Sequence, residues 1–126
     1  MASELRVNTL KDASGNNSIG MSYVAEGTCK AWNHVNQDTT GHPPEDSFNI
    51  ASTSDTGAGS TRSNFTSAMN NANYSGVGSA TVDNSYGDNC CVGAFTTSRY
   101  DVYCDAGNNT NTDNVDVKSI IVGDLA

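Results

Sequence analysis

Apolar and polar residues alternate in short runs along most of the chain, with the period of a half-buried β-strand. Residues 99–104, RYDVYC, place Tyr100, Val102 and Cys104 on one face, and residues 115–123, VDVKSIIVG, alternate in the same way. Further runs of this kind occupy residues 5–7, 24–35, 48–50, 61–65, 73–82 and 91–97. The pattern predicts seven or eight strands separated by turn clusters, as in a sandwich or a small barrel.

The segment SFNIASTSDTGAGSTRSNF, residues 47–65, predicts a β-hairpin. Its tip is expected at residues 55–59, where glycine supplies the positive φ that a tight turn needs. Residues 36–47 contain a Pro-Pro pair and predict a loop outside the ladder, because proline lacks a backbone donor. Residues 66–73, TSAMNNAN, are the one candidate for a helical turn.

The composition supports a single all-β domain. The 126 residues are 36% hydrophobic and 16% charged, so most of the polarity comes from Asn, Ser, Thr and Gly. These residues disfavour helix and favour turns, and threonine also suits strands. We expect one antiparallel β-sandwich or jelly-roll-like domain over residues 21–126. A short extended attachment or leader segment, residues 1–20, precedes it and needs a sheet to dock on.

The charge distribution argues against two classes of partner. The formal net charge is -8, and the six basic residues are scattered singly. Without a basic patch to neutralise phosphates, we expect no nucleic-acid partner. No stretch has the apolar length of a bilayer span, and the N-terminus lacks the basic and apolar regions of a signal peptide. We therefore expect no membrane insertion and a mature chain that begins at or near Met1.

Four cysteines, Cys29, Cys90, Cys91 and Cys104, allow three interpretations. We expect buried free thiols, because no secretion signal indicates an oxidising compartment. Two disulfides are a first alternative and a metal site is a second. Neighbours on a strand face opposite sides, so Cys90 and Cys91 do not readily point at one metal.

Catalytic patterns are not visible in the sequence. Glu45 and Asp46 are adjacent in a predicted loop, whereas glycosidases need two carboxylates about 5–10 Å apart across a sugar site. A nucleophile elbow, a phosphate-binding loop and a dinucleotide fingerprint are also missing. We expect a protein that is not an enzyme and has no cofactor.

Two histidines invite a metal-site interpretation. His34 and His42 lie near Asp38 and Glu45 in the sequence, and His, Asp and Glu side chains can all ligate metals. Spacing alone does not show convergence, so we expect two exposed histidines without a metal.

The order of several short phrases resembles a module found in virion proteins of marine phages, especially tail fibres and similar appendages of cyanophages. The phrases are Lys30-Ala31-Trp32, Ser47-Phe48-Asn49, the Gly-rich turn at 55–59, Met69-Asn70-Asn71-Ala72-Asn73-Tyr74, the leader LRVNTLKDASGNN (5–17) and the closing IIVGD (120–124). The resemblance covers about residues 5–124. The Pro-Pro pair and the Cys90-Cys91 pair depart from it.

The resemblance implies a bacteriophage virion structural protein, an exterior appendage subunit such as a tail fibre, capsid fibre or decoration protein. Such subunits assemble from identical chains, most often as homotrimers, and dock on other virion proteins of the capsid or tail. The implied location is the virion exterior, after assembly in the host bacterial cytoplasm. The alternative is a receptor-binding protein at a fibre tip that recognises a host surface glycan.

Candidate residues follow for both functions. For the interface we expect Leu5, Val7 and Leu10 in the leader and Trp32 in a strand. Trp32 lies in the middle of its strand, which favours a core or interface anchor over a sugar-stacking platform. For receptor contact, the candidates in predicted loops are His42, Tyr86, Asn108 and Asn109.

Overall fold

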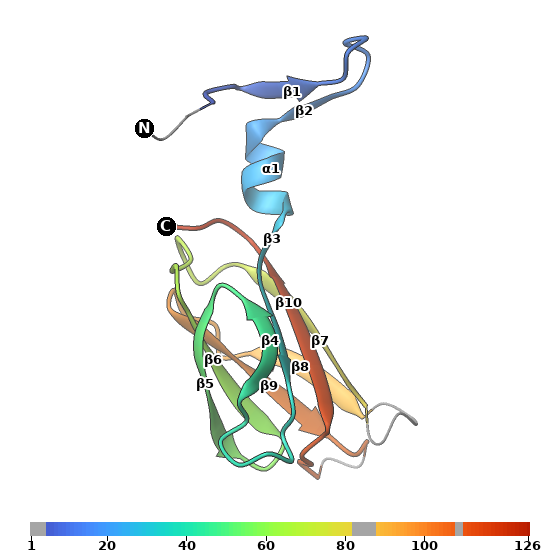
Figure 1. Ribbon diagram of the computed structural model, residues 1–126, viewed down its shortest axis with the longest axis vertical. Coiled ribbons are helices and arrows are strands. Elements are labelled where there is room, and N and C mark those ends of the chain that lie inside the picture. The colour runs from blue at the N-terminus through green and yellow to red at the C-terminus, as the bar shows by residue number, and fades with distance from the viewer. Residues whose placement is uncertain (1–4, 82–87, 108–109) are drawn as a thin grey trace.

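Two four-stranded antiparallel sheets pack face to face in a computed structural model that describes residues 5–81, 88–107 and 110–126 (Figure 1). The first sheet has the order β4-β3-β10-β7 and the second β5-β6-β9-β8. The strands of the first sheet are β3 (Cys29–Val35), β4 (Pro44–Phe48), β7 (Ser75–Thr81) and β10 (Asp116–Val122). Those of the second are β5 (Ile50–Gly57), β6 (Ser60–Phe65), β8 (Asn89–Gly93) and β9 (Arg99–Asp105). The predicted all-β sandwich is confirmed.

An arm protrudes from one end of the sandwich (Figure 1). It contains a hairpin of β1 (Thr9–Lys11) and β2 (Ser18–Gly20), followed by α1 (Met21–Gly27). The strand predicted at residues 5–7 is therefore wrong, and the first part of the strand predicted at 24–35 is helical. None of the described strands pairs with residues 24–27, and their backbone forms part of the helix instead. We use "arm" for residues 5–28.

The chain passes from the first sheet to the second at Asn49. This residue has φ 58°, a left-handed conformation that asparagine tolerates better than most residues. Its amide nitrogen donates to Lys30 O (3.0 Å) and Ser67 O (3.1 Å), and its amide oxygen accepts from Ser67 N (2.7 Å). Residues 48 and 50, expected to share one strand, consequently lie in different sheets.

The hairpin predicted in residues 47–65 is confirmed as β5 and β6, with a tight turn at Ala58 and Gly59. Gly59 has φ 65°, and a Cβ there would lie 2.3 Å from Cys104 O. The expectation that the Pro-Pro pair stays out of the ladder is wrong, because Pro44 begins β4 opposite Val35. β4 is an edge strand, and an edge position does not require the donor that proline lacks.

Two further segments differ from the sequence prediction. Residues 66–73 form no helical turn; Met69 pairs with Leu125 in an isolated bridge instead. The strand predicted at 91–97 is shifted and ends at Gly93, because Ala94 adopts a positive φ of 50°. Both differences arise where tertiary contacts override local preference.

The core between the sheets has an apolar part and a polar part. Phe65 packs against Tyr74 and Tyr100, with ring centroids 5.7 and 5.4 Å apart. The other buried apolar residues are Ala31, Val35, Met69, Ala80, Val102, Cys104, Val117 and Ile121. Among the buried polar groups, Asn33 Nδ2 donates to Ser63 Oγ across the sandwich at 3.0 Å. Buried polar residues thus supply part of a core for which the sequence has few apolar residues.

Candidate interaction surfaces

The outer face of the first sheet is set by strand alternation. In β3, Ala31, Asn33 and Val35 point into the core, so Trp32 and His34 point outward. In β10, Val117, Ser119 and Ile121 are buried, and the residues between them face the same exterior side as Trp32.

Four large apolar side chains form one line across this outer face. Trp32 lies directly opposite Phe48 on one side and Ile120 on the other, and Ile120 lies opposite Val77. Trp32 is half-buried, whereas Phe48, Ile120 and Val77 are 53%, 50% and 66% exposed. We call these four residues the apolar row. Exposed apolar side chains gathered in one patch, unlike isolated ones, indicate a candidate interaction surface.

A polar line runs beside the apolar row. His34 lies opposite both Asp46 and Lys118 on its neighbouring strands. His34 Nε2 is 2.6 Å from Asp116 Oδ1 and 3.2 Å from Glu45 Oε2. The Lys118 Nζ donates to both Asp116 carboxylate oxygens, which lowers the pKa of Asp116 against the opposing effect of burial. The outer face therefore changes from apolar to charged over two residues of β3, from Trp32 to His34.

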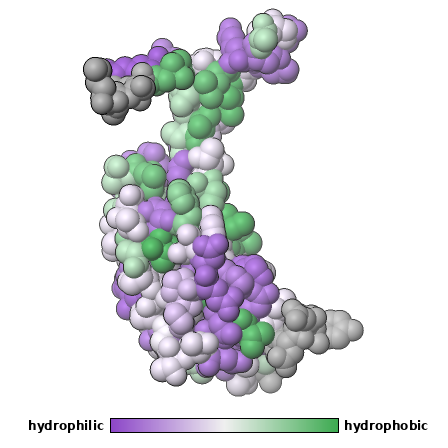
Figure 2. All heavy atoms as spheres, viewed as in Figure 1, coloured by the Kyte–Doolittle hydropathy of each residue, from purple (hydrophilic) through white to green (hydrophobic). Residues whose placement is uncertain are grey.

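The arm presents a second apolar surface. Its hairpin turn is held by the Asp12 carboxylate, which accepts from Asn16 N, Ser14 Oγ and Asn17 Nδ2. The exposed large apolar residues of the arm are Leu5, Val7, Leu10, Ile19 and Tyr23. Helix α1 buries none of its residues, and Figure 2 shows hydrophobic side chains on the arm's surface.

The predicted interface residues lie on two separate surfaces. Leu5, Val7 and Leu10 belong to the arm, and Trp32 belongs to the apolar row. Their exposure is compatible with an interface, but the chain does not bring them together. Sequence reasoning missed Phe48 and Ile120 as parts of the same surface. The Ile-Ile pair at 120–121 could have indicated an exposed apolar residue here, because neighbouring residues on a strand face opposite sides of the sheet.

His42 corrects the expectation of two exposed histidines. Its side chain is buried, and Nδ1 lies 2.8 Å from Thr61 Oγ1. Gln37 Nε2 donates to the same Thr61 oxygen at 3.0 Å. A residue enclosed in this way does not reach a receptor, so the prediction that His42 contacts one is wrong. The other receptor candidates, Tyr86, Asn108 and Asn109, lie outside the described residues.

The histidines also do not converge on a common metal site. His34 meets Glu45 on the outer face of the first sheet, while His42 is buried near Asp55 and Asp113. The carboxylate oxygens of those two residues lie 3.7 and 3.9 Å from His42 Nε2. Within the described ranges, no group of three or more His, Cys, Asp or Glu side chains could hold a metal ion.

All four cysteines are free thiols, but only part of the expected burial is found. Cys104 is buried, Cys90 is half-buried, and Cys29 and Cys91 are exposed. Cys90 and Cys104 face each other on neighbouring strands, with sulfur atoms 3.2 Å apart. The hydrogen bond from the Cys104 thiol lowers the pKa of Cys90, and the same contact together with burial raises the pKa of Cys104.

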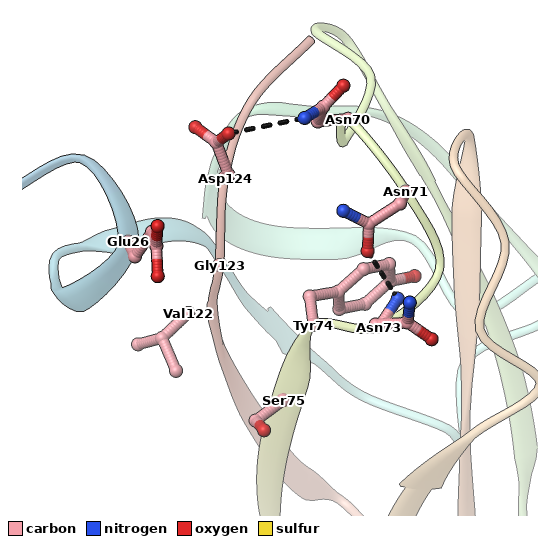
Figure 3. A pocket seen from close by; sticks show the side chains of 9 residues that line it. All are labelled: Glu26, Asn70, Asn71, Asn73, Tyr74, Ser75, Val122, Gly123 and Asp124. Carbon is pink, nitrogen blue, oxygen red and sulfur yellow. Dashed lines mark hydrogen bonds between the residues drawn. The ribbon is translucent and has the colours of Figure 1, made fainter. Parts of the chain in front are cut away.

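A hollow of about 450 Å³ lies where the arm joins the sandwich (Figure 3). Asparagine side chains line part of it, but they bond to nearby groups of the chain. Asn70 Nδ2 donates to Asp124 Oδ2 at 3.3 Å, and Asn71 Oδ1 accepts from Asn73 N at 2.7 Å. Tyr74 is buried beneath them. These amides shape the loop, and two of them are already engaged before any ligand arrives.

Comparisons of the chain with protein-family models, with curated proteins and with solved structures gave no match. Within the residues that the structure describes, no helix has the length and apolar character needed to cross a membrane. The two apolar surfaces and the sequence resemblance are therefore the basis on which a function is proposed.

Proposed function

We propose that this chain is a bacteriophage virion structural protein, an exterior appendage subunit that self-assembles and docks on the particle. Tail fibre, capsid fibre and decoration protein are the forms that the sequence resemblance implies. The observation that carries the proposal is the apolar row formed by Phe48, Trp32, Ile120 and Val77. Together with the exposed apolar residues of the arm, it provides two surfaces suited to packing against identical chains.

The energetic argument concerns apolar area left in water. Burying apolar surface contributes roughly 25 cal/mol per Å², and the apolar row and arm leave much of theirs exposed. The internal core is correspondingly thin, because polar side chains such as Asn33, Thr61 and Ser63 occupy part of it. Association of identical chains, with a trimer as the expected assembly, would bury the exposed apolar side chains.

The acidic charge supports a position on the particle's exterior. With a net charge of -8, the chain is repelled by packaged nucleic acid. The free thiols agree with assembly in a reducing bacterial cytoplasm.

Two measurements test the proposal. Sedimentation of the purified full chain should give a defined oligomer at micromolar concentration; a compact monomer would remove the self-assembly argument. Antibody labelling of intact virions of the phage that encodes the chain should detect it on their surface. Labelling only after the particles are disrupted would contradict an exterior location.

Host-glycan recognition is the alternative, and it has less support from the described residues. His42 is buried, and two of the asparagines at the hollow bond within the chain. Adsorption of the isolated protein to host cells, competed by host surface glycan, would favour this alternative.

A further inference from the structure

We propose that the arm of one copy lies across the apolar row of a second copy. This inference rests on the self-assembly proposed above and names the two surfaces that meet. The occupant of the apolar row is thus a segment of this same chain, contributed by its neighbour.

The arm leaves most of its large apolar side chains exposed in the described part of the chain. Strands β1 and β2 have three residues each, and a two-stranded hairpin of this size is marginal in water. Helix α1 has seven residues, none of them buried, and a helix so short is unstable in isolation. Leu10 and Ile19 lie opposite each other in the hairpin, and both are exposed. A neighbouring molecule that covers these side chains would stabilise the arm.

The chain's own apolar row is poorly placed to be that partner. Thr28 alone joins α1 to β3, and α1 continues beyond the end of the sheet, with the hairpin farther out (Figure 1). Each copy thus offers one arm and one uncovered apolar row. A head-to-tail contact between these different surfaces closes into a ring when the rotation between copies permits it.

Charge complementarity favours this pairing over contact between two apolar rows. The arm contains two basic residues, Arg6 and Lys11, and two acidic ones, so it has no net charge and both of its basic residues lie before the hairpin turn, whereas residues 29–126 contain four basic and eleven acidic residues. Three carboxylates lie on two of the strands that contribute to the apolar row. Glu45 and Asp46 are in β4 with Phe48, and Asp116 is in β10 with Ile120. Two rows facing each other would bring these carboxylates together.

The arm also combines apolar and positive side chains in one segment. Leu5, Val7 and Leu10 alternate with or adjoin the basic residues Arg6 and Lys11, so one extended segment carries both apolar and positive groups.

A cysteine cross-link tests the contact directly. One full-length chain carries Leu10→Cys and a second carries Ile120→Cys; both positions are exposed, so the substitutions should not impair folding. The two chains are mixed, oxidised with oxidised glutathione and digested with trypsin. The new thiols fall in peptides 7–11 and 119–126, and neither peptide contains a native cysteine. Only a contact between two molecules can join these peptides in the mixture.

The matched control replaces Ile120→Cys by Ser52→Cys, an exposed position on the second sheet in peptide 31–62, which also lacks native cysteines. We expect the 7–11 to 119–126 link to exceed the control link by at least about ten-fold, because docking raises the effective concentration of the two thiols. As a second measurement, Leu10→Asp should weaken association by roughly ten-fold or more.

The outcomes separate this inference from the proposed function. An oligomer without the 7–11 to 119–126 link overturns arm docking and leaves self-assembly standing. Links between two copies of peptide 119–126 alone would show that row packs on row. A link seen only when both substitutions are in one chain would show that the arm covers its own row. A monomer at every concentration would overturn the proposed self-assembly itself.

Discussion

Ile120 of β10 lies directly opposite Trp32 of β3, and both side chains point away from the core. The next residue, Ile121, is fully buried between the sheets. Two adjacent isoleucines therefore belong to different surfaces, one external and one internal. This arrangement provides a matched pair of substitutions that separates assembly from folding.

Replacing Ile121 and Ile120 by alanine should have different consequences. Ile121→Ala should lower the free energy of unfolding by about 2–5 kcal/mol, because it leaves a cavity in the core. Ile120→Ala should lower the unfolding free energy of the isolated chain by less than about 1 kcal/mol. It should nevertheless shift sedimentation toward smaller species. Denaturant titration and sedimentation of both variants check this, and equal destabilisation by the two would contradict the assigned faces.

Trp32→Ala should abolish assembly before it reduces soluble expression. The indole is half-buried in the middle of the apolar row, where aromatic residues contribute most to interfaces. Sedimentation of the variant should show a smaller species than the native chain, while its yield is maintained. Ser79→Ala, on the same face beside the row, is the control and should leave assembly unchanged. Unchanged oligomerisation of Trp32→Ala would mean that the indole serves another purpose.

Thr61→Val tests the buried polar network around His42. The change keeps the shape of the side chain and removes the hydroxyl that bonds Gln37 and His42. Leaving these buried groups without a partner should cost about 1–3 kcal/mol of unfolding free energy. Thr66→Val, at an exposed position, should change it by no more than about 0.5 kcal/mol. Denaturant titration compares the two, and equal effects would argue against a structural role for the network.

Stability should fall with rising pH in the alkaline range because of Tyr74. Burial raises the pKa of Tyr74 to about 12, and its hydroxyl oxygen lies 2.7 Å from Arg99 O. Tyrosine in the unfolded chain loses its proton near pH 10, so the unfolded state is favoured as pH rises from about 10 to 12. Below about pH 10 this contribution to stability is fully present.

Denaturant titrations at a series of pH values check the alkaline loss. Tyr74→Phe should make the decline in unfolding free energy between about pH 10 and 12 shallower than in the native protein. The variant also loses a hydrogen bond, so the slope with pH, rather than the absolute stability, is compared. Identical slopes would show that Tyr74 does not ionise differently in the two states.

Cys90 and Cys104 should form a cross-strand disulfide when the protein is oxidised. With oxidised glutathione as acceptor, the two thiols lose two protons and two electrons, and two molecules of reduced glutathione are released. Cys90 should react first, because its pKa is lowered by the thiol of Cys104. Peptide mapping should find residues 63–99 linked to 100–118 in the native chain.

The adjacent cysteine is the control for that link. Cys91→Ser should retain it, because Cys91 is exposed on the opposite side of β8, whereas Cys90→Ser should abolish it. Retention of the link in Cys90→Ser would show that Cys91 is the partner and that the assigned faces of β8 are wrong.

Sequence patterns located several strands correctly because their alternation is local. In β10, Val117, Ser119 and Ile121 alternate with outward residues, and no distant contact is needed to see it. The sheet change at Asn49 was missed because its left-handed φ depends on bonds to Lys30 and Ser67, which are remote in sequence. The edge position of Pro44 likewise follows from which strands pair.

The candidate surface was predicted only in part. Trp32 was identified from its place in a strand, but its neighbours Phe48, Ile120 and Val77 come from three other strands. Register between strands is a tertiary property, so one strand's pattern could not reveal the row. His42 was misplaced because loop composition predicts exposure, whereas its partner Thr61 lies in β6.

By itself, the sequence determined the all-β class and the scarcity of apolar core residues. Tertiary structure decided which polar residues are buried and which apolar residues are left outside. The physical reason is that a buried amide or hydroxyl costs stability unless a partner lies within hydrogen-bond distance. Asn33 Nδ2 has such a partner in Ser63 Oγ, on the opposite sheet, whereas Asn33 Oδ1 is buried without one.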